Sequence, residues 1–161
     1  MIILPIRYFL IQPFYVKGAS MEPNFFDHEY LIIDEINYRF KAPTRGDVIV
    51  FRYPKDPQEY FIKRIVGLPG ERVQFKDGDV YVYNQQNPQG LRLDDSYLTP
   101  GIKTYGLSED PVDVGTDDFF VLGDNRMASK DSRSFGSVNR SFFIGRVVFR
   151  GWPFDRAGII K

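Results

Sequence analysis

The chain has 161 residues, which is enough for one domain with its own core. Lysine plus arginine number 21 and aspartate plus glutamate also number 21, so the chain lacks the excess positive charge that binding to a nucleic-acid backbone requires. Cysteine is absent and there is a single histidine, which excludes disulfides, thiol nucleophiles and metal sites built from several cysteines or histidines. Abundant phenylalanine and tyrosine, together with short β-branched runs, favour a sheet-based fold.

Residues 1–16 are apolar and aromatic but are interrupted by Pro5, Arg7 and Pro13. A bilayer-spanning helix needs about 20 predominantly apolar residues, so this segment is too short and too broken to cross a membrane alone. It also lacks the charged start and the small-residue cleavage site of a secretory signal. We expect its second half, residues 8–16, to form a core strand.

A serine follows this segment in a turn of small residues, within the sequence KGASMEP over residues 17–23. Ser20 comes directly after Gly18 and Ala19 and directly before the apolar Met21, as in a tight turn. Most serines in such turns have no catalytic role, so the turn alone does not indicate an enzyme.

The strand around which the chain is organised has the sequence FIKRIVGLPGE over residues 61–71, and a Gly/Pro turn at residues 67–70 ends it. Alternate side chains of a strand share a face, so Lys63 lies between the apolar Phe61 and Ile65. Burial of that face would lower the lysine pKa and make the neutral amine available as a base. The alternative is a lysine that snorkels from a strand edge, which Lys63 alone does not exclude.

The other strands are predicted from short apolar runs between turn residues. Two runs precede the lysine strand, at residues 30–35 and 47–53, and the second is nearly continuously apolar, as a central strand would be. Further along, Asp77-Gly78 between two alternating runs is a strong hairpin signal. Residues 84–117 are polar and turn-rich, which predicts a long loop-rich excursion. Two apolar runs then return to the core and complete the sheet, at residues 119–122 and 142–149.

Four sequence boxes, in this order, resemble the catalytic signatures of the type I signal peptidases: KGASMEP (17–23), RGDVIVF (45–51), FIKR (61–64) and GDNRMASKDSR (123–133). On these boxes the chain is identified as a member of that family. The resemblance implies a mostly β, antiparallel fold, related to that of the self-cleaving LexA-type SOS repressors, with a small loop-rich second subdomain. It also implies a serine endopeptidase with Ser20 as nucleophile, Lys63 as general base and no cofactor.

The resemblance assigns supporting roles as well. Ser129 aligns with the serine that hydrogen-bonds and orients the lysine amine, while Asp131 and Arg133 align with an ion pair that supports the same loop. Many relatives have a serine oxyanion donor two positions before the nucleophile, and that position here is Gly18. Two hypotheses stay open for Gly18: a backbone amide donor, or space for a water molecule. Arg64, next to the base, is expected to serve strand pairing or loop geometry.

An extended substrate is expected to lie as a strand beside the segment before Ser20 and beside the Lys63 strand. The first and third residues before the scissile bond then share a face and should be small, as in Ala-x-Ala. The resemblance implies signal peptides of exported preproteins as substrates and a location on the extracytoplasmic face of the cell membrane. Because the family carries membrane anchors upstream of the serine, we interpret residues 1–16 as a remnant of an anchor that contacts membrane lipid. The apolar substrate surface is expected to be built by Met21, Phe61 and Ile62.

We expect the catalytic β-domain to comprise residues 17–83 and 118–161, with residues 84–117 as a variable subdomain. A self-cleaving SOS repressor is an alternative with the same chemistry, but it would require a helix-turn-helix domain and an Ala-Gly or Cys-Gly pair upstream of the serine, and the sequence has neither. A catalytically silent β-domain that binds peptides by strand addition is a second alternative, and it would not require Ser20 and Lys63. A Ser-His-Asp triad on His28 has no motif behind it.

Overall fold

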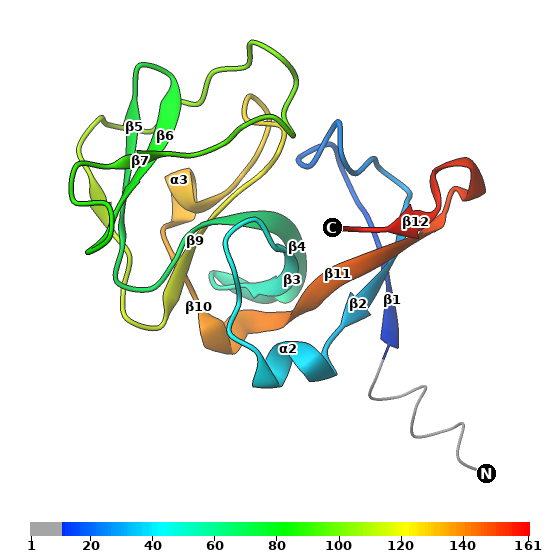
Figure 1. Cartoon of the computed structure of the whole chain (residues 1–161). Helices are drawn as coiled ribbons and strands as arrows, with labels where there is room; N and C mark the ends of the chain where they lie inside the picture. The colour runs from blue at the N-terminus through cyan, green and yellow to red at the C-terminus, as the bar shows by residue number, and fades with distance from the viewer. Residues whose placement is uncertain (1–10) are drawn as a thin grey trace.

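The computed structural model describes residues 11–161, which form two mostly antiparallel β-sheets, as the sequence predicts (Figure 1). The larger sheet has seven strands in the spatial order β1 (Ile11–Tyr15), β2 (Tyr30–Asp34), β11 (Phe143–Trp152), β3 (Val48–Tyr53), β4 (Asp56–Gly67), β9 (Asp118–Leu122) and β10 (Val138–Asn139), and an eighth, β12 (Gly158–Ile159), pairs with β11. The smaller sheet has the order β7 (Leu91–Arg92), β6 (Asp79–Tyr83), β5 (Arg72–Lys76) and β8 (Val112–Asp113). The helical segments are short: α2 (Ile36–Phe40), α3 (Ser132–Phe135), η1 (Arg140–Phe142) and η2 (Phe154–Arg156).

Strand β3 is central, which confirms the prediction from its continuous apolar run. It lies between β11 and β4, and its first four residues are buried. In the β3–β4 pair, Ile49 is opposite Lys63 and Phe51 is opposite Phe61, so these side chains share one face of the sheet. Ile65 packs on the same face, as alternation along the lysine strand predicts.

The lysine strand is buried on both faces of the sheet. On one face Ile65 packs with Ile49, Phe51 and their neighbours. On the other face Ile62 packs with a cluster that includes Val16, Met21, Phe25, Leu31 and Val50. A polar side chain on this part of β4 is therefore withdrawn from water, whichever face it points to.

The second sheet packs against the ends of β4 and β9, where Val66, Phe120 and Leu122 meet the apolar face of β5 and β6. Asp77 and Gly78 both have positive φ, 55° and 81°, in the turn that joins β5 to β6, and this confirms the predicted hairpin. The sequence division placed this hairpin in the catalytic part. In the structure it forms the smaller sheet together with β7 and β8, and its apolar face packs against β4 and β9 of the larger sheet.

The first described strand, β1, lies within the strand predicted over residues 8–16 and pairs with β2. Most of the apolar segment interpreted as an anchor remnant, residues 1–10, lies outside the described residues. Among residues 11–161, no helix is long and apolar enough to cross a membrane. Strand β11, which contains the last predicted apolar run, is an interior strand of the larger sheet and lies between β2 and β3 (Figure 1).

Candidate active site

The Ser20 turn follows β1 and is anchored in the core by the residue after the serine. The N–H groups of Asn24 and Phe25 both donate to the Met21 carbonyl, at 3.0 and 2.9 Å. The Met21 side chain is fully buried, and the N–H of Asp124 donates to its sulfur at 3.4 Å. Ser20 itself stays partly exposed and lines a cavity.

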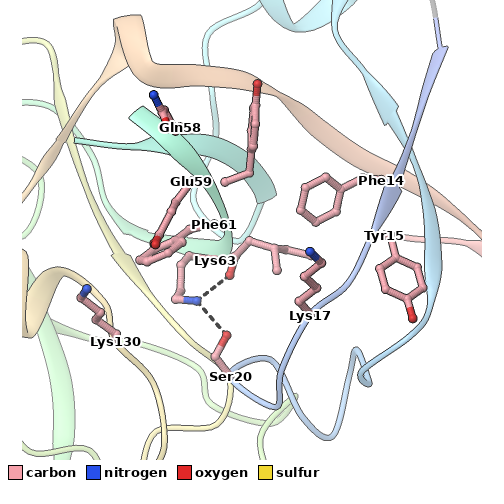
Figure 2. Close-up of a pocket in the computed structure, with 11 residues that line it drawn as sticks. Phe14, Tyr15, Lys17, Ser20, Gln58, Glu59, Phe61, Lys63 and Lys130 are labelled. Atoms are coloured by element: carbon pink, nitrogen blue, oxygen red, sulfur yellow. Dashed lines mark hydrogen bonds between the residues drawn. The ribbon is translucent and has the colours of Figure 1, made fainter. Parts of the chain in front are cut away.

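Lys63 extends from β4 with its amine directed at Ser20 (Figure 2). The Nζ atom donates to Ser20 Oγ at 2.7 Å and to the Ile62 carbonyl at 2.8 Å, and the residue is 4% exposed. Burial lowers the pKa of Lys63 from its ordinary 10.5 to about 8, although the carboxylates of Asp131 and Asp124 oppose this shift. The amine is therefore neutral in an appreciable fraction of molecules near neutral pH, at a distance from which it can accept the hydroxyl proton.

A cavity of about 630 Å³ opens beside Ser20 and Lys63, between β1 and β4 (Figure 2). Six consecutive residues of β4, residues 58–63, line one side of it. Six strand residues span about 16 Å, so the cavity is long enough for several residues of an extended peptide. The rest of the lining comes from the segment before the serine and from the late box, which is the last of the four sequence boxes, residues 123–133: Phe14, Tyr15, Lys17 and Lys130.

The three residues expected to form the apolar substrate surface are not all placed together. Phe61 and Ile62 line the cavity. Met21 does not, because its side chain points into the core. Aromatic packing instead extends the wall behind Phe61: Tyr53 stacks on it with ring centroids 4.5 Å apart, and Lys130 Nζ lies 4.3 Å from the Tyr53 centroid.

Ser129 lies close to the dyad but does not make the expected hydrogen bond to the lysine. Its Oγ is buried and has no hydrogen-bond partner among the described residues, while Lys63 uses the Ile62 carbonyl as its second acceptor. Gly123 brings this loop against the nucleophile turn. A Cβ there would lie 2.0 Å from Ser129 Oγ and 2.5 Å from the Ser20 carbonyl oxygen, so only glycine permits this approach.

Asp131 and Arg133 are brought together in the late box. Arg133 donates to both carboxylate oxygens of Asp131, at 2.9 and 2.8 Å, and the carboxylate is fully buried. Asp131 also accepts from the N–H of Gly123 at 3.0 Å and caps the first turn of α3. The pair therefore ties the start of the late box to its end.

Of the two hypotheses for Gly18, the structure argues against a backbone amide that donates to the oxyanion. Its N–H donates to Asp27 Oδ1 at 2.8 Å, on the loop that leads back to β2. The residue has φ of +84°, a conformation that favours glycine, and no atom lies within 4 Å of where a Cβ would be. The position therefore leaves open space, and its backbone donor is already in use.

Two arginines support the site through contacts that the sequence did not predict: Arg126, which is buried, and Arg64, which is partly buried. Arg64 forms a bidentate pair with Asp124 at 2.8 and 2.6 Å, so of the two roles expected for it, this contact fits loop geometry and not strand pairing. Arg126 donates to Thr104 Oγ1 at 2.7 Å and to the Tyr97 hydroxyl at 2.9 Å, which joins the late box to the segment 84–117. The only sequence signal was the presence of both arginines inside catalytic boxes.

His28, the single histidine, is exposed and does not line the cavity. Its Nδ1 lies 3.2 Å from Asp27 Oδ2 at the surface. Within residues 11–161, no three histidine, aspartate or glutamate side chains gather in the way that metal binding requires.

Comparison with known proteins places these features in context. A family model described as "Signal peptidase, peptidase S26" matches residues 1–152. The chain is 40% identical over 161 residues to a probable signal peptidase I-2 of Synechocystis, covering 96% of this chain and 69% of that protein. It is 32% identical over 158 residues to signal peptidase IB of Staphylococcus aureus, covering 91% and 81%. The crystal structure of a signal peptidase I from Enterococcus faecalis superposes with a TM-score of 0.53 and 31% identity, covering 66% of this chain and 97% of that one.

Proposed function

Because the chain belongs to the peptidase S26 family of signal peptidases and is a serine peptidase, we propose that it removes signal peptides from exported preproteins with Ser20 and Lys63 as its catalytic dyad. The assignment of this dyad rests on the 2.7 Å hydrogen bond between Lys63 Nζ and Ser20 Oγ. The burial of Lys63 supports it further, because it moves the pKa of the amine into a range useful for a base.

In the proposed reaction, neutral Lys63 accepts the hydroxyl proton of Ser20 while Oγ attacks the carbonyl carbon of the scissile bond. The resulting oxyanion needs hydrogen-bond donors, and we assign this role to the Ser20 N–H, which donates to no acceptor in the described part of the chain. Collapse of the intermediate transfers the proton from Lys63 to the leaving amine and leaves an acyl ester on Ser20. Water, deprotonated by Lys63, then hydrolyses the ester and restores the serine.

We assign to residues of the late box the role of orienting this dyad. Ser129 Oγ is buried, unpartnered and next to the Ser20 carbonyl, so it is available as an acceptor when the Lys63 amine turns away from the Ile62 carbonyl. The pair of Asp131 and Arg133 holds the loop that carries Ser129. These residues orient the base and take no direct part in bond breaking.

The substrate is assigned to the cavity between β1 and β4, as an extended chain that adds a strand between them. Alternate residues of such a chain face the same side, where Phe61 and the Tyr53 ring stacked on it form a wall, while Ile62 lines the cavity from the other face of β4. We propose that this wall leaves space for a methyl group one and three residues before the cut, which corresponds to Ala-x-Ala.

We further propose that the protein works at the extracytoplasmic face of the cell membrane, where preproteins emerge. Residues 17–83 and 118–161 are proposed as the catalytic part and residues 84–117 as a variable subdomain. The hydrogen bonds from Arg126 to Thr104 and Tyr97 support a structural role for that subdomain, since they join it to the late box.

Cleavage of a purified preprotein tests the proposal. The protein should release a shortened product whose new N-terminus follows an Ala-x-Ala sequence, and Ser20→Ala should abolish this while circular dichroism stays unchanged. Binding of a signal peptide without any turnover by the wild-type protein would instead favour a peptide-binding β-domain.

A further inference from the structure

Asn24, four residues after Ser20, contacts two parts of the chain that are distant in sequence. Its side-chain nitrogen donates to Asp124 Oδ2 and to the Tyr97 carbonyl, both at 2.8 Å. Asp124 belongs to the late box and Tyr97 to the segment 84–117. Both N–H groups of this amide are therefore used to hold the Ser20 turn against its surroundings.

The main-chain carbonyl of Asn24 is held from a third direction, by the C-terminal part of the chain. Arg150 donates to this carbonyl, and so does Arg156, at 3.4 Å. Both guanidinium groups also pair with the carboxylate of Glu29, at 3.0 and 2.6 Å, and Glu29 is only 2% exposed. Moving both arginines away would leave the buried Glu29 carboxylate unpaired, so these ion pairs hold the two guanidinium groups at the Asn24 carbonyl.

Asp124 continues these contacts to the strand that carries the base. Its carboxylate accepts from Arg64 at 2.8 and 2.6 Å, and its side chain is fully buried. Arg64 is the residue after Lys63 on β4. A continuous path of hydrogen bonds therefore runs from the Ser20 turn through Asn24 and Asp124 to the backbone next to Lys63.

We propose that Asn24 is a positioning residue, which sets the separation of Ser20 Oγ and Lys63 Nζ by holding the Ser20 turn against Asp124. The inference rests on the proposed roles of Ser20 and Lys63. Asn24 makes no hydrogen bond to either reacting atom, so it acts through the placement of the turn. A displacement of about 1 Å in such a turn is enough to reduce the rate by roughly 10²-fold.

The test compares three variants of the full chain. Asn24→Ala removes both donors. Asn24→Asp keeps the shape of the side chain but sets a second carboxylate against Asp124, and it carries the test if the alanine variant does not fold. Asn84→Ala is the matched control, because Asn84 also donates to a carboxylate, Glu71 Oε1, at 2.8 Å, and it does so beside the second sheet. The measurements are kcat and KM on an Ala-x-Ala peptide, Tm, and the pKa of Lys63 by NMR titration.

Both Asn24 variants should lose about tenfold or more in kcat, while KM stays within about threefold of the wild-type value. The Lys63 pKa should rise from about 8 towards its ordinary value, because a loosened turn admits water to the amine. Asn84→Ala should lower Tm and leave both kcat and the Lys63 pKa unchanged.

Wild-type kcat together with an unchanged Lys63 pKa in the Asn24 variants would overturn the assignment. Equal losses of kcat in Asn24→Ala and Asn84→Ala would overturn it as well, since the effect would then be one of general stability. A wild-type protein that cleaves nothing would refute the proposed function instead, and the Lys63 titration would still decide the role of Asn24.

Discussion

The rate of peptide cleavage should depend on pH through Lys63, because only the neutral amine accepts the Ser20 proton. With the pKa of Lys63 lowered to about 8, roughly 10% of molecules carry the neutral amine at pH 7. With the ordinary value of 10.5, the neutral fraction at pH 7 is about 0.03%. Burial of Lys63 therefore raises the active fraction at neutral pH by about 300-fold.

The assay is kcat/KM for an Ala-x-Ala peptide from pH 5.5 to 10, which reports ionisations of the free enzyme. We expect kcat/KM to rise about tenfold per pH unit below 8 and to level off above about pH 9. His28→Gln is the control, because His28 is exposed and does not line the cavity.

Two results would contradict this reasoning. A kcat/KM that still rises tenfold per pH unit between pH 9 and 10, with no plateau, would mean that burial does not lower the lysine pKa from its ordinary 10.5. A limb near 6.5 that shifts in His28→Gln would indicate a histidine base and would exclude Lys63 from that role.

Four further predictions concern single changes. Lys63→Arg should abolish cleavage in a folded protein, because a guanidinium stays protonated at any pH used in a gel assay. Lys63→Met should stabilise the protein at pH 7 by up to about 3 kcal/mol in urea unfolding. The folded wild type releases the lysine proton near pH 8 and the unfolded chain only near 10.5, so wild-type stability rises across this window and the difference disappears above it. Arg133→Ala should lower stability by about 3–5 kcal/mol, because the fully buried Asp131 carboxylate loses its partner. Arg92→Ala, in an exposed pair, should have a much smaller effect. Equal effects of the two changes in thermal melts would contradict the support assigned to the late box. Leu or Phe directly before the scissile bond should reduce cleavage by orders of magnitude and the same change one residue earlier should matter little, so a peptide library with equal tolerance at both positions would refute the proposed wall.

Much of the fold could be predicted from the sequence, because strand faces and tight turns depend on residues that are neighbours in the chain. Alternation placed Phe61, Lys63 and Ile65 on one face of β4, and they lie there. The Asp77-Gly78 pair predicted a hairpin for the same local reason. Ser20 and Lys63 were predicted as catalytic residues only through the family resemblance, because neither residue indicates catalysis by itself.

The tertiary structure decided which polar groups are already paired, and this no local pattern could reveal. The Gly18 N–H is not a free donor, because it donates to the Asp27 carboxylate. Met21 does not contribute to the substrate surface, because its side chain anchors the Ser20 turn in the core. Arg64 pairs with Asp124, a residue 60 positions away in the chain. Such contacts form only when loops from several strands pack together, since a buried polar group must find whichever partner that packing brings within reach. The lysine pKa has the same origin, because it depends on water removed by both faces of the sheet at once.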